Sequence, residues 1–497
     1  MKLKLLISLL FFGNILLSHG QWVQIGSDLV GESPGNLFGK SVSLSADGSI
    51  VAVGMPVYGG NNVDVAGSVR IFENLNGSWI QIGDDIEGEN IDDEFGTSIS
   101  LSADGSIVAI GAHLNDGNGS DSGHVRVYKN DNGSWLQIGD DIDGETAVDY
   151  SGFSVSLSAD GNIVAIGAIF NDDNGISSGH VRVFENVNDV WMQIGGDIDG
   201  EAAYDDSGYS VSLSDDGSII AIGAKTNDSN GSNSGHVRVY KNDNGSWIQV
   251  GDDIDGEGEG DNSGFSVSLS ANGSIVAIGA KWNNDGASNA GHVRVYENIN
   301  DSWTQIGTDI DGQTNTGNFG YSVSLSANGN IVAIGVPFSN TNGNDTGHIS
   351  IYENNNGSWM QKGEDIVGSI INGTFGTAVS LSDDGSIVAG GTWRDGYTNT
   401  SGRVRIFEFD ESLSVKSLEK QQFTVYPNPA VTNISIKSKI SFESVAVYDI
   451  FGRKIASSIP NISNLEHFFN VQNLSSGVYL IELKKGSQKR VQKFIKK

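Results

Sequence analysis

The sequence contains no cysteine. Neither disulfide bonds nor a lipid-modified N-terminal cysteine can therefore hold or anchor the chain, and its stability must come from packed secondary structure. Proline is scarce as well, with 6 residues, whereas the 67 glycines indicate many tight turns. Beyond residues 1–20, no segment approaches the roughly 18 continuous apolar residues that a membrane-spanning helix requires.

Basic residues are few in most of the chain. The protein has 29 Lys and Arg against 61 Asp and Glu, a net charge of −32. Residues 1–411 carry 16 basic and 56 acidic side chains, a net −40, whereas residues 412–497 carry 13 and 5, a net +8. This change predicts a domain boundary. The acidic part argues against a nucleic-acid partner, because such binding depends on Lys and Arg contacts to phosphate, and it favours either solubility or cation binding.

The N-terminus has the layout of a secretory signal peptide. Lys2 and Lys4 precede the apolar run Leu5–Leu17, and small and polar residues follow up to position 20. A membrane anchor is the alternative, but the apolar run is short and is interrupted by Gly13 and Asn14. We therefore expect residues 1–20 to be removed from an exported chain.

A Trp-x-Gln motif recurs seven times, with a spacing of 57 residues once and 56 thereafter. Such a fixed period is typical of a repeat array in which each period is one supersecondary unit. The tryptophans are Trp22, Trp79, Trp135, Trp191, Trp247, Trp303 and Trp359.

Each unit reads as four short strands. In the second unit they are Ser98–Ser102, which alternates polar and apolar residues, the fully apolar Ile107–Ala112, then His124–Asn130 and Trp135–Gly139. Asp104-Gly105 joins the first two strands and favours a tight hairpin turn. A second strand that is apolar on both faces is typical of a sheet covered on both sides by its neighbours.

These features predict an all-β protein in which residues 21–410 form a seven-bladed β-propeller with four-stranded blades. A strand at Trp22–Ile25 precedes the first unit, whereas the last unit stops after the third strand at Arg403–Phe409. We expect the N-terminal strand to close the seventh blade. The alternative, an open solenoid, would leave both terminal edges bare.

Two short elements give the array a family resemblance. A Phe-Gly element occurs in four units and is reversed to Gly-Phe or Gly-Tyr in the other three, and Gly-Ala ends strand two in four units. The array resembles the FG-GAP repeats of integrin α-subunit propellers and their bacterial relatives. The calcium loop of that family, between strands one and two, is here reduced to dipeptides such as Asp104-Gly105. One carboxylate cannot supply the six to eight oxygens that calcium takes, so this site is not expected.

The long loops, between strands two and three and between blades, share one acidic face of the predicted propeller. Asp141, Asp143 and Glu145 lie in the run Gly139–Glu145 and are weak calcium candidates, although their spacing does not match a helix-flanked calcium loop. The alternative is a set of solvated turns in which Asp and Asn cap backbone donors. Calcium is thus the one candidate cofactor.

The residues that follow strand two differ between units, and recognition in a repeat scaffold lies where the repeats diverge. Exposed aromatics there suit sugar rings or protein partners, whereas drift in an unconstrained loop is the alternative. The aromatic members are predicted to form a contact rim. The candidate ligand-binding residues are His113, Phe170, Lys225, Trp282, Phe338, Trp393 and Arg394.

No catalytic constellation breaks the repeat symmetry, so no catalytic residues are predicted and an enzyme is not expected. Five repeated histidines open strand three. They are predicted to be structural, because evenly spaced blades keep them from meeting at one metal ion. These are His124, His180, His236, His292 and His348.

After a linker at residues 411–421, residues 422–497 form a second, strand-rich domain, predicted as a small Ig-like β-sandwich. Three motifs occur in order: Tyr426-Pro427-Asn428-Pro429, Tyr448-Asp449-x-x-Gly452-Arg453 and Ser475-Ser476-Gly477-Val478-Tyr479. They resemble the type A C-terminal sorting domain of type IX secretion substrates from Bacteroidota. The resemblance implies that the secretion machinery is a partner and that the protein is released or attached to the outer cell surface. An ordinary Ig-like binding module is the alternative.

The sequence as a whole predicts a secreted or cell-surface propeller, monomeric, that binds an extracellular protein or glycan through its acidic loop-rich face. The competing hypothesis is a polysaccharide-active enzyme with its site in the same face.

Overall fold

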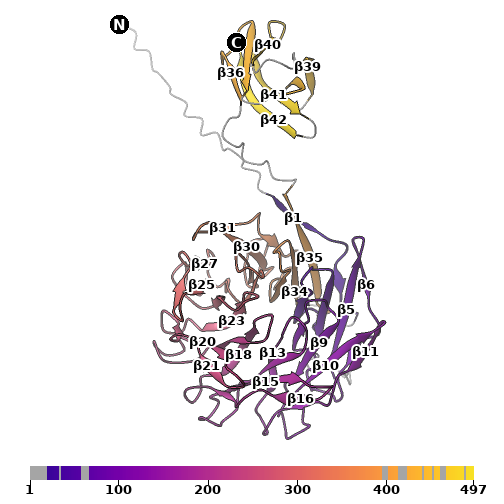
Figure 1. Cartoon of the computed structure of the whole chain (residues 1–497), viewed down its shortest axis with the longest axis vertical. Helices are drawn as coiled ribbons and strands as arrows, with labels where there is room; N and C mark the ends of the chain where they lie inside the picture. Colours follow the sequence, from indigo (N-terminus) through magenta and orange to yellow (C-terminus); the bar gives the residue numbers. More distant parts are fainter. Residues whose placement is uncertain are drawn as a thin grey trace. The chain divides into compact units, whose positions relative to one another are not determined.

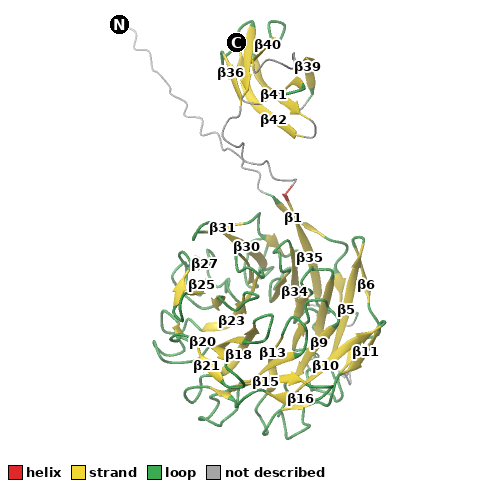
Figure 2. Cartoon of the chain, in the orientation of Figure 1, coloured by secondary structure: helices red, strands yellow, loops and turns green. Residues whose placement is uncertain are grey.

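The computed structural model describes residues 20–32, 35–56, 66–393, 401–411, 423–438, 442–449, 453–458, 466–485 and 488–497. The chain divides into two compact units, one spanning His19–Leu413 and the other containing Ser414–Lys497. Both are built from strands (Figure 2). Of the predicted signal peptide and linker, only Gly20 and Glu411 lie within the described residues.

The larger unit consists of seven antiparallel sheets, which we call blades 1 to 7. Blade 1 contains β3 (Val42–Leu44), β4 (Ile50–Met55), β5 (Ser68–Leu75), β6 (Ser78–Gln81) and β7 (Ile86–Glu87), and blade 2 contains β8 (Ser98–Leu101), β9 (Ile107–Ala112), β10 (His124–Asp131), β11 (Ser134–Gln137) and β12 (Ile142–Asp143). Blade 3 contains β13 (Ser151–Leu157), β14 (Ile163–Ala168), β15 (His180–Asn186), β16 (Trp191–Gln193) and β17 (Ile198–Asp199). Blade 4 contains β18 (Ser207–Leu213), β19 (Ile219–Ala224), β20 (His236–Asn242), β21 (Trp247–Gln249) and β22 (Ile254–Asp255).

The remaining blades follow the same order. Blade 5 contains β23 (Ser263–Leu269), β24 (Ile275–Ala280), β25 (His292–Asn298), β26 (Trp303–Gln305) and β27 (Ile310–Asp311). Blade 6 contains β28 (Ser322–Leu325), β29 (Ile331–Val336), β30 (His348–Asn354), β31 (Trp359–Gln361) and β32 (Ile366–Val367). Blade 7 contains β33 (Ala378–Leu381), β34 (Ile387–Thr392), β35 (Arg403–Asp410), β1 (Gln21–Gln24) and β2 (Leu29–Val30).

The N-terminal strand closes the seventh blade, as the sequence predicted. β1 pairs antiparallel with β35, with Trp22 opposite Phe409, and β2 extends the same pairing opposite Val404. The colour sequence in Figure 1 therefore runs around the unit from indigo to orange and meets itself where β35 lies beside β1. This pairing leaves the two chain ends of the propeller in one sheet and removes the bare edges of an open solenoid.

Two rings of hydrogen bonds join the inner strands of successive blades. The backbone N–H of Leu101 donates to Ser43 Oγ of the preceding blade at 3.0 Å, each following blade repeats this bond, and Leu44 donates to Ser380 Oγ at 2.9 Å to close the circle. A second ring of backbone bonds ends with Asp383 N–H donating to the Ala46 carbonyl at 2.8 Å. The small serine side chains let the inner strands approach closely enough for these contacts.

The outer strands hold neighbouring blades together through the repeated tryptophans. The Nε1–H of Trp191 donates to the Ile138 carbonyl of the preceding blade at 2.9 Å, and Trp22 donates to the Lys362 carbonyl at 2.8 Å. The second strands are almost fully buried between blades, as in β9, whose six residues are all buried. Both features agree with the packing that the sequence predicted.

The outer edge of each blade differs from the predicted four strands. β11 ends at Gln137, and after a short turn the chain returns as β12, which pairs with His124 and Val125 of β10. Gly139 adopts a φ of +70° at this interruption, a conformation that glycine takes readily. Part of the run Gly139–Glu145, expected to be a loop, is therefore a fifth short strand.

The smaller unit contains two sheets that share one core. β36 (Phe423–Tyr426), β37 (Asn433–Ser438) and β40 (Glu466–Asn470) form one, and β39 (Lys454–Ser458), β38 (Ser444–Asp449), β41 (Gly477–Lys485) and β42 (Gln488–Lys496) form the other. Ile434 of the first sheet and Val447, Ile481 and Phe494 of the second belong to the same buried cluster. Among the described residues of the whole chain, no helix is long and apolar enough to span a bilayer.

Candidate functional site

Four aromatic rings follow one another along the start of the inner strands in blades 3 to 6. Each stands directly after a glycine, as in Gly152-Phe153, and we call them the aromatic row: Phe153, Tyr209, Phe265 and Tyr321. Successive ring centroids lie 5.1, 4.9 and 5.0 Å apart. These tilted contacts lie within the range that aromatic pairs prefer, so the four rings form a continuous row, in which Phe265 is buried at 7 % exposure.

The order of glycine and aromatic residue decides where the ring lies. Phe38, Phe95 and Phe375 precede their glycines and are between 0 % and 2 % exposed in the core between blades. The rings of the aromatic row follow the glycine and contact one another along the start of the inner strands instead, a place that we call the mouth of the axis. Gly152 itself has a φ of +86°, and a Cβ there would lie 2.5 Å from the His124 carbonyl oxygen, so no larger residue fits.

Three predicted residues extend the aromatic row at its two ends. The His113 ring lies 5.5 Å from Phe153 and 5.4 Å from Tyr150, and Phe170 lies 4.9 Å from Tyr150. At the other end, Phe338 lies 6.1 Å from Tyr321. His113, Phe170 and Phe338 come from the segments that follow strand two in blades 2, 3 and 6, so divergent loops contribute to both ends of the row.

The ammonium groups of lysine side chains lie over these rings. Lys281 Nζ lies 3.5 Å from the Phe265 centroid and 4.6 Å from the ring of Trp282, which is 43 % exposed. Lys225 Nζ lies 4.3 Å from the Tyr209 centroid and forms an ion pair with Asp206. Both ammonium groups are within the distance of a cation–π interaction. Lys40 Nζ stands in the same way 5.4 Å from the Trp393 ring.

Burial shifts the protonation of several groups at the mouth. Burial, aided by the charges of Lys225 and Lys40, lowers the pKa of Lys281 to about 7. Burial, with Lys40 adding to it, lowers the pKa of His113 to about 4. Burial raises the pKa of Glu94 to about 7 against the opposing charge of Lys40. The Glu94 Oε2 atom lies 3.6 Å from His113 Nε2. Titratable groups with shifted pKa values that lie close together are more frequent at functional sites.

We call the aromatic row, its extensions and these charged groups the axial cluster. Of the predicted ligand-binding residues, His113, Phe170, Lys225, Trp282 and Phe338 contact one another through it, and Trp393 contacts Lys40. Arg394 lies outside the described residues. Sequence reasoning missed the aromatic row, Lys40, Glu94, Tyr150 and Lys281. The Gly-aromatic order in four consecutive units was the available signal for the row.

The three calcium candidates do not share a site. Asp141 accepts hydrogen bonds from Arg126 with both carboxylate oxygens, at 2.8 and 2.7 Å. The Asp143 carbonyl accepts one from Arg182 at 2.6 Å, and Glu145 reaches across to blade 3, where its Oε2 lies 3.9 Å from His180 Nδ1. Among the described residues, no group of donors within 4.8 Å of one another contains two of the three. The three side chains therefore have different partners, and calcium at these residues stays a prediction.

In the short turn between strands one and two, the aspartate carboxylate accepts hydrogen bonds from other residues of the same turn. Asp104 Oδ1 accepts hydrogen bonds from Ser102 Oγ at 2.8 Å and from the N–H and Oγ of Ser106 at 2.9 and 2.7 Å. Although burial opposes it, these hydrogen bonds lower the pKa of Asp104. The turn is thus a capped hairpin, in agreement with the loss of the family's calcium loop.

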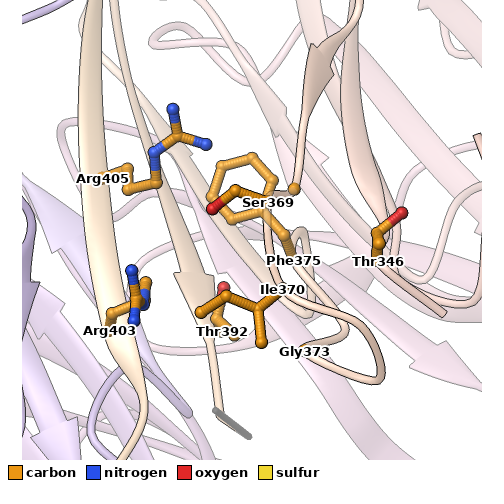
Figure 3. Close-up of a pocket in the computed structure, with 9 residues that line it drawn as sticks. Thr346, Ser369, Ile370, Gly373, Phe375, Thr392, Arg403 and Arg405 are labelled. Atoms are coloured by element: carbon orange, nitrogen blue, oxygen red, sulfur yellow. The ribbon is translucent and has the colours of Figure 1, made fainter. Parts of the chain in front are cut away.

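A small cavity lies between blades 6 and 7, lined by Arg403, Arg405, Ser369 and Phe375 among others (Figure 3). Its volume of about 10 Å³ suits one water molecule rather than a substrate. Arg403 stands where five other blades begin strand three with histidine.

The motif residues of the C-terminal domain stabilise its fold where they are described. Asn428 Oδ1 accepts a hydrogen bond from Ile495 N–H at 2.8 Å, and Arg453 Nε donates to Asp449 Oδ2 at 2.7 Å. Tyr479 stacks on Phe494 at 5.7 Å and donates its hydroxyl to the Ser475 carbonyl at 2.9 Å. Tyr426 is 45 % exposed, and Pro427 and Pro429 flank Asn428 on the surface. Gly477 opens β41, whereas Gly452 lies outside the described residues.

The sheets and the axial cluster define an all-β propeller protein with a C-terminal β-sandwich domain. Residues 88–128 and 199–240 match the FG-GAP repeat, and residues 424–497 match the secretion system C-terminal sorting domain. The protein therefore contains FG-GAP repeats and is exported by type IX secretion to the cell surface or the extracellular space, and the resemblance seen in its sequence is confirmed. No curated protein matches the chain.

Solved propeller-like structures resemble the chain at low identity. A proposed 6-phosphogluconolactonase from Bacteroides uniformis is 12 % identical, with a TM-score of 0.49 over 85 % of this chain and 100 % of its own. A periplasmic gluconolactonase from Pseudomonas aeruginosa is 15 % identical, with a TM-score of 0.47 over 66 % of this chain and 85 % of its own. At these values neither likeness transfers an activity.

Proposed function

We propose that the protein is an extracellular binding or adhesion module that holds a glycan at the axial cluster. The observation that supports this most is the aromatic row, four rings in consecutive blades with centroids 4.9 to 5.1 Å apart. Sugar rings stack on aromatic faces, and a row of rings offers successive stacking positions to a chain of sugars. Rigid inner strands place these rings before the ligand arrives, which lowers the entropic cost of binding.

The charges of the axial cluster favour an acidic sugar. Lys225, Lys281 and Lys40 lie at the mouth of the axis, whereas residues 1–411 as a whole have a net charge of −40. The acidic surroundings repel a general polyanion, whereas the local cations attract one carboxylate that reaches the mouth. The acidic loop-rich face therefore repels general polyanions, and the axial cluster contacts the carboxylate of the sugar.

The test uses the full mature chain on glycan and matrix-protein arrays. We expect binding to acidic oligosaccharides that Phe265→Ala and Trp282→Ala each weaken at least about tenfold, since one lost stacking contact of about 1.4 kcal/mol gives that factor. Leu136→Ala is the matched control, because Leu136 is 54 % exposed on an outer strand, and it should leave binding unchanged. Binding to matrix protein alone, or glycan binding insensitive to both variants, would contradict the proposal.

One observation favours a second candidate, a polysaccharide-active enzyme. Glu94, whose pKa burial raises to about 7, lies 3.6 Å from His113, whose pKa burial lowers, so a carboxyl that can give up a proton near neutral pH lies beside an imidazole. Polysaccharide turnover that Glu94→Gln abolishes would establish this activity and displace the binding function. Binding without turnover would support the module.

A further inference from the structure

Histidine and carboxylate groups from two blades converge at the interface between blades 2 and 3. Glu145 comes from blade 2, and Asp173, His180 and Asp197 come from blade 3. One donor atom of each residue lies within 4.8 Å of the others. The interface between blades 4 and 5 repeats the arrangement with Glu257, Asp285, His292 and Asp309.

The histidine in each group is buried with an unpaired nitrogen that faces the carboxylates. His180 is 0 % exposed, and its Nδ1, which has no hydrogen-bond partner, lies 3.9 Å from Glu145 Oε2. His292 is 1 % exposed, and its unpaired Nδ1 lies 3.7 Å from Glu257 Oε2. These separations are too long for hydrogen bonds. A buried polar atom without a partner is costly, which indicates that a further atom belongs between the nitrogen and the oxygens.

In each group, a neighbouring side chain lies against one oxygen of a carboxylate, so that the other oxygen is available to a metal ion beside the histidine. Gln193 Nε2 donates to Asp197 Oδ1 at 2.6 Å, and Arg182 NH1 lies 3.7 Å from Glu145 Oε1, opposite the Oε2 that faces His180. In the second group, Gln305 holds Asp309 and Arg294 stands by Glu257 in the same way. Outer contacts of this kind orient the ligands of a metal site.

Each of the other interfaces lacks at least one of these requirements. At blade 2, Arg126 occupies both oxygens of Asp141, and at blade 4, Ser229 stands where blade 3 has Asp173. Gln313 replaces the bridging glutamate before blade 6, and Arg403 replaces the histidine in blade 7 (Figure 3). Within the described part of the chain, two interfaces thus combine all four donors.

We propose that each of these two interfaces binds one first-row divalent transition-metal ion, through His180 or His292 and three carboxylates, and that the ion clamps two neighbouring blades. Calcium is not the expected ion, because it takes oxygen ligands, whereas one imidazole with carboxylates suits Zn²⁺ and its neighbours. The histidines need not meet one another, since each one meets carboxylates from its own blade and from the blade before it.

The test is titration of the full mature chain with Zn²⁺ by calorimetry, together with visible absorption of Co²⁺ as a readout of coordination. We expect two ions per chain, and one after Asp173→Asn or His180→Ala. Asp173→Asn is conservative and lies on an exposed loop, so it keeps the fold. Combining Asp173→Asn with Asp285→Asn should leave none.

Matched controls separate a built site from the acidity of the surface. Asp140→Asn removes an exposed carboxylate outside the groups, and His124→Ala removes the equivalent histidine where Arg126 holds the aspartate; both variants should keep two ions. Zn²⁺ bound in a number that Asp173→Asn and His180→Ala leave unchanged, no heat at millimolar Zn²⁺, or a Co²⁺ spectrum unaffected by these variants would each overturn the proposal.

Discussion

Lys281 lies in the axial cluster, where burial of its ammonium group lowers the stability of the folded state. Its ammonium group is held among Phe265, Trp282 and Tyr321, close enough for cation–π contact with each ring, at 3.5, 4.6 and 5.5 Å. These contacts do not fully replace water, since burial still lowers the pKa of Lys281 to about 7. A charge retained in such a place is more readily explained by a ligand than by folding.

Replacing this lysine should therefore stabilise the propeller in a pH-dependent way. Because the pKa of Lys281 is lower in the folded state, the unfolded chain binds more protons between pH ~7 and ~10.5, and folding is weakened increasingly as the pH falls through that window. We expect Lys281→Met to raise the Tm by a few degrees at pH 6 and by much less at pH 10.5, measured by calorimetry. Lys241→Met, on the outer end of β20, is the control. An equal gain at both pH values would contradict the shift.

Individual residues mark where the sequence was informative and where it was not. The divergent positions His113, Phe170 and Phe338 were identifiable because they break a regular period. The partners of His180 were not, because Glu145 and Asp173 lie in different units, and their approach depends on the blade-to-blade distance. Glu94 was equally hidden, since its raised pKa comes from burial that no local pattern records.

At the scale of the strands, the period of 56 residues and the turn dipeptides were sufficient to predict the blades and their closure. The fifth strand was not predicted, because a two-residue strand such as β12 has too few residues for a period to show. Its position nevertheless matters, since β12 leads directly to Glu145 and so presents that carboxylate to the next blade.

The closing strand gives a prediction at this scale. Trp22 contacts the Phe409 ring at 5.2 Å and donates to the Lys362 carbonyl at 2.8 Å, while Asp28 forms an ion pair with Arg403 at 2.7 Å. Removing residues 21–30 also removes the pairing of β1 and β2 with β35. At about 1 kcal/mol for each lost hydrogen bond, we expect the Tm to fall by at least about 5 °C in a thermal melt.

A matched variant and a rescue make this outcome specific. Val23→Ser changes a side chain that is 44 % exposed on the same strand and should leave the Tm nearly unchanged. A synthetic peptide of residues 20–32, added in excess, should restore most of the loss by pairing with β35. An unchanged Tm after the deletion would mean that the seventh blade does not depend on the N-terminal strand.

At the scale of the whole chain, the two units carry opposite charge and separate tasks. Residues 1–411, which contain the propeller, have a net charge of −40, and residues 412–497 have +8. The axial cluster and the histidine–carboxylate groups all lie in the propeller, whereas the match to the sorting domain covers residues 424–497. The match to the sorting domain and the proposed ligand site thus lie in different units of the chain.

Export should therefore follow the C-terminal unit alone. In a host with type IX secretion, we expect deletion of residues 423–497 to leave the propeller in the periplasm, because the match to the sorting domain lies there. Joining residues 412–497 to a periplasmic reporter should carry that reporter to the surface or the medium. Surface labelling and fractionation measure both results. Phe265→Ala in the full chain is the control, since it changes the axial cluster and should leave export intact. Normal export of the truncated chain would show that the sorting information lies in the propeller.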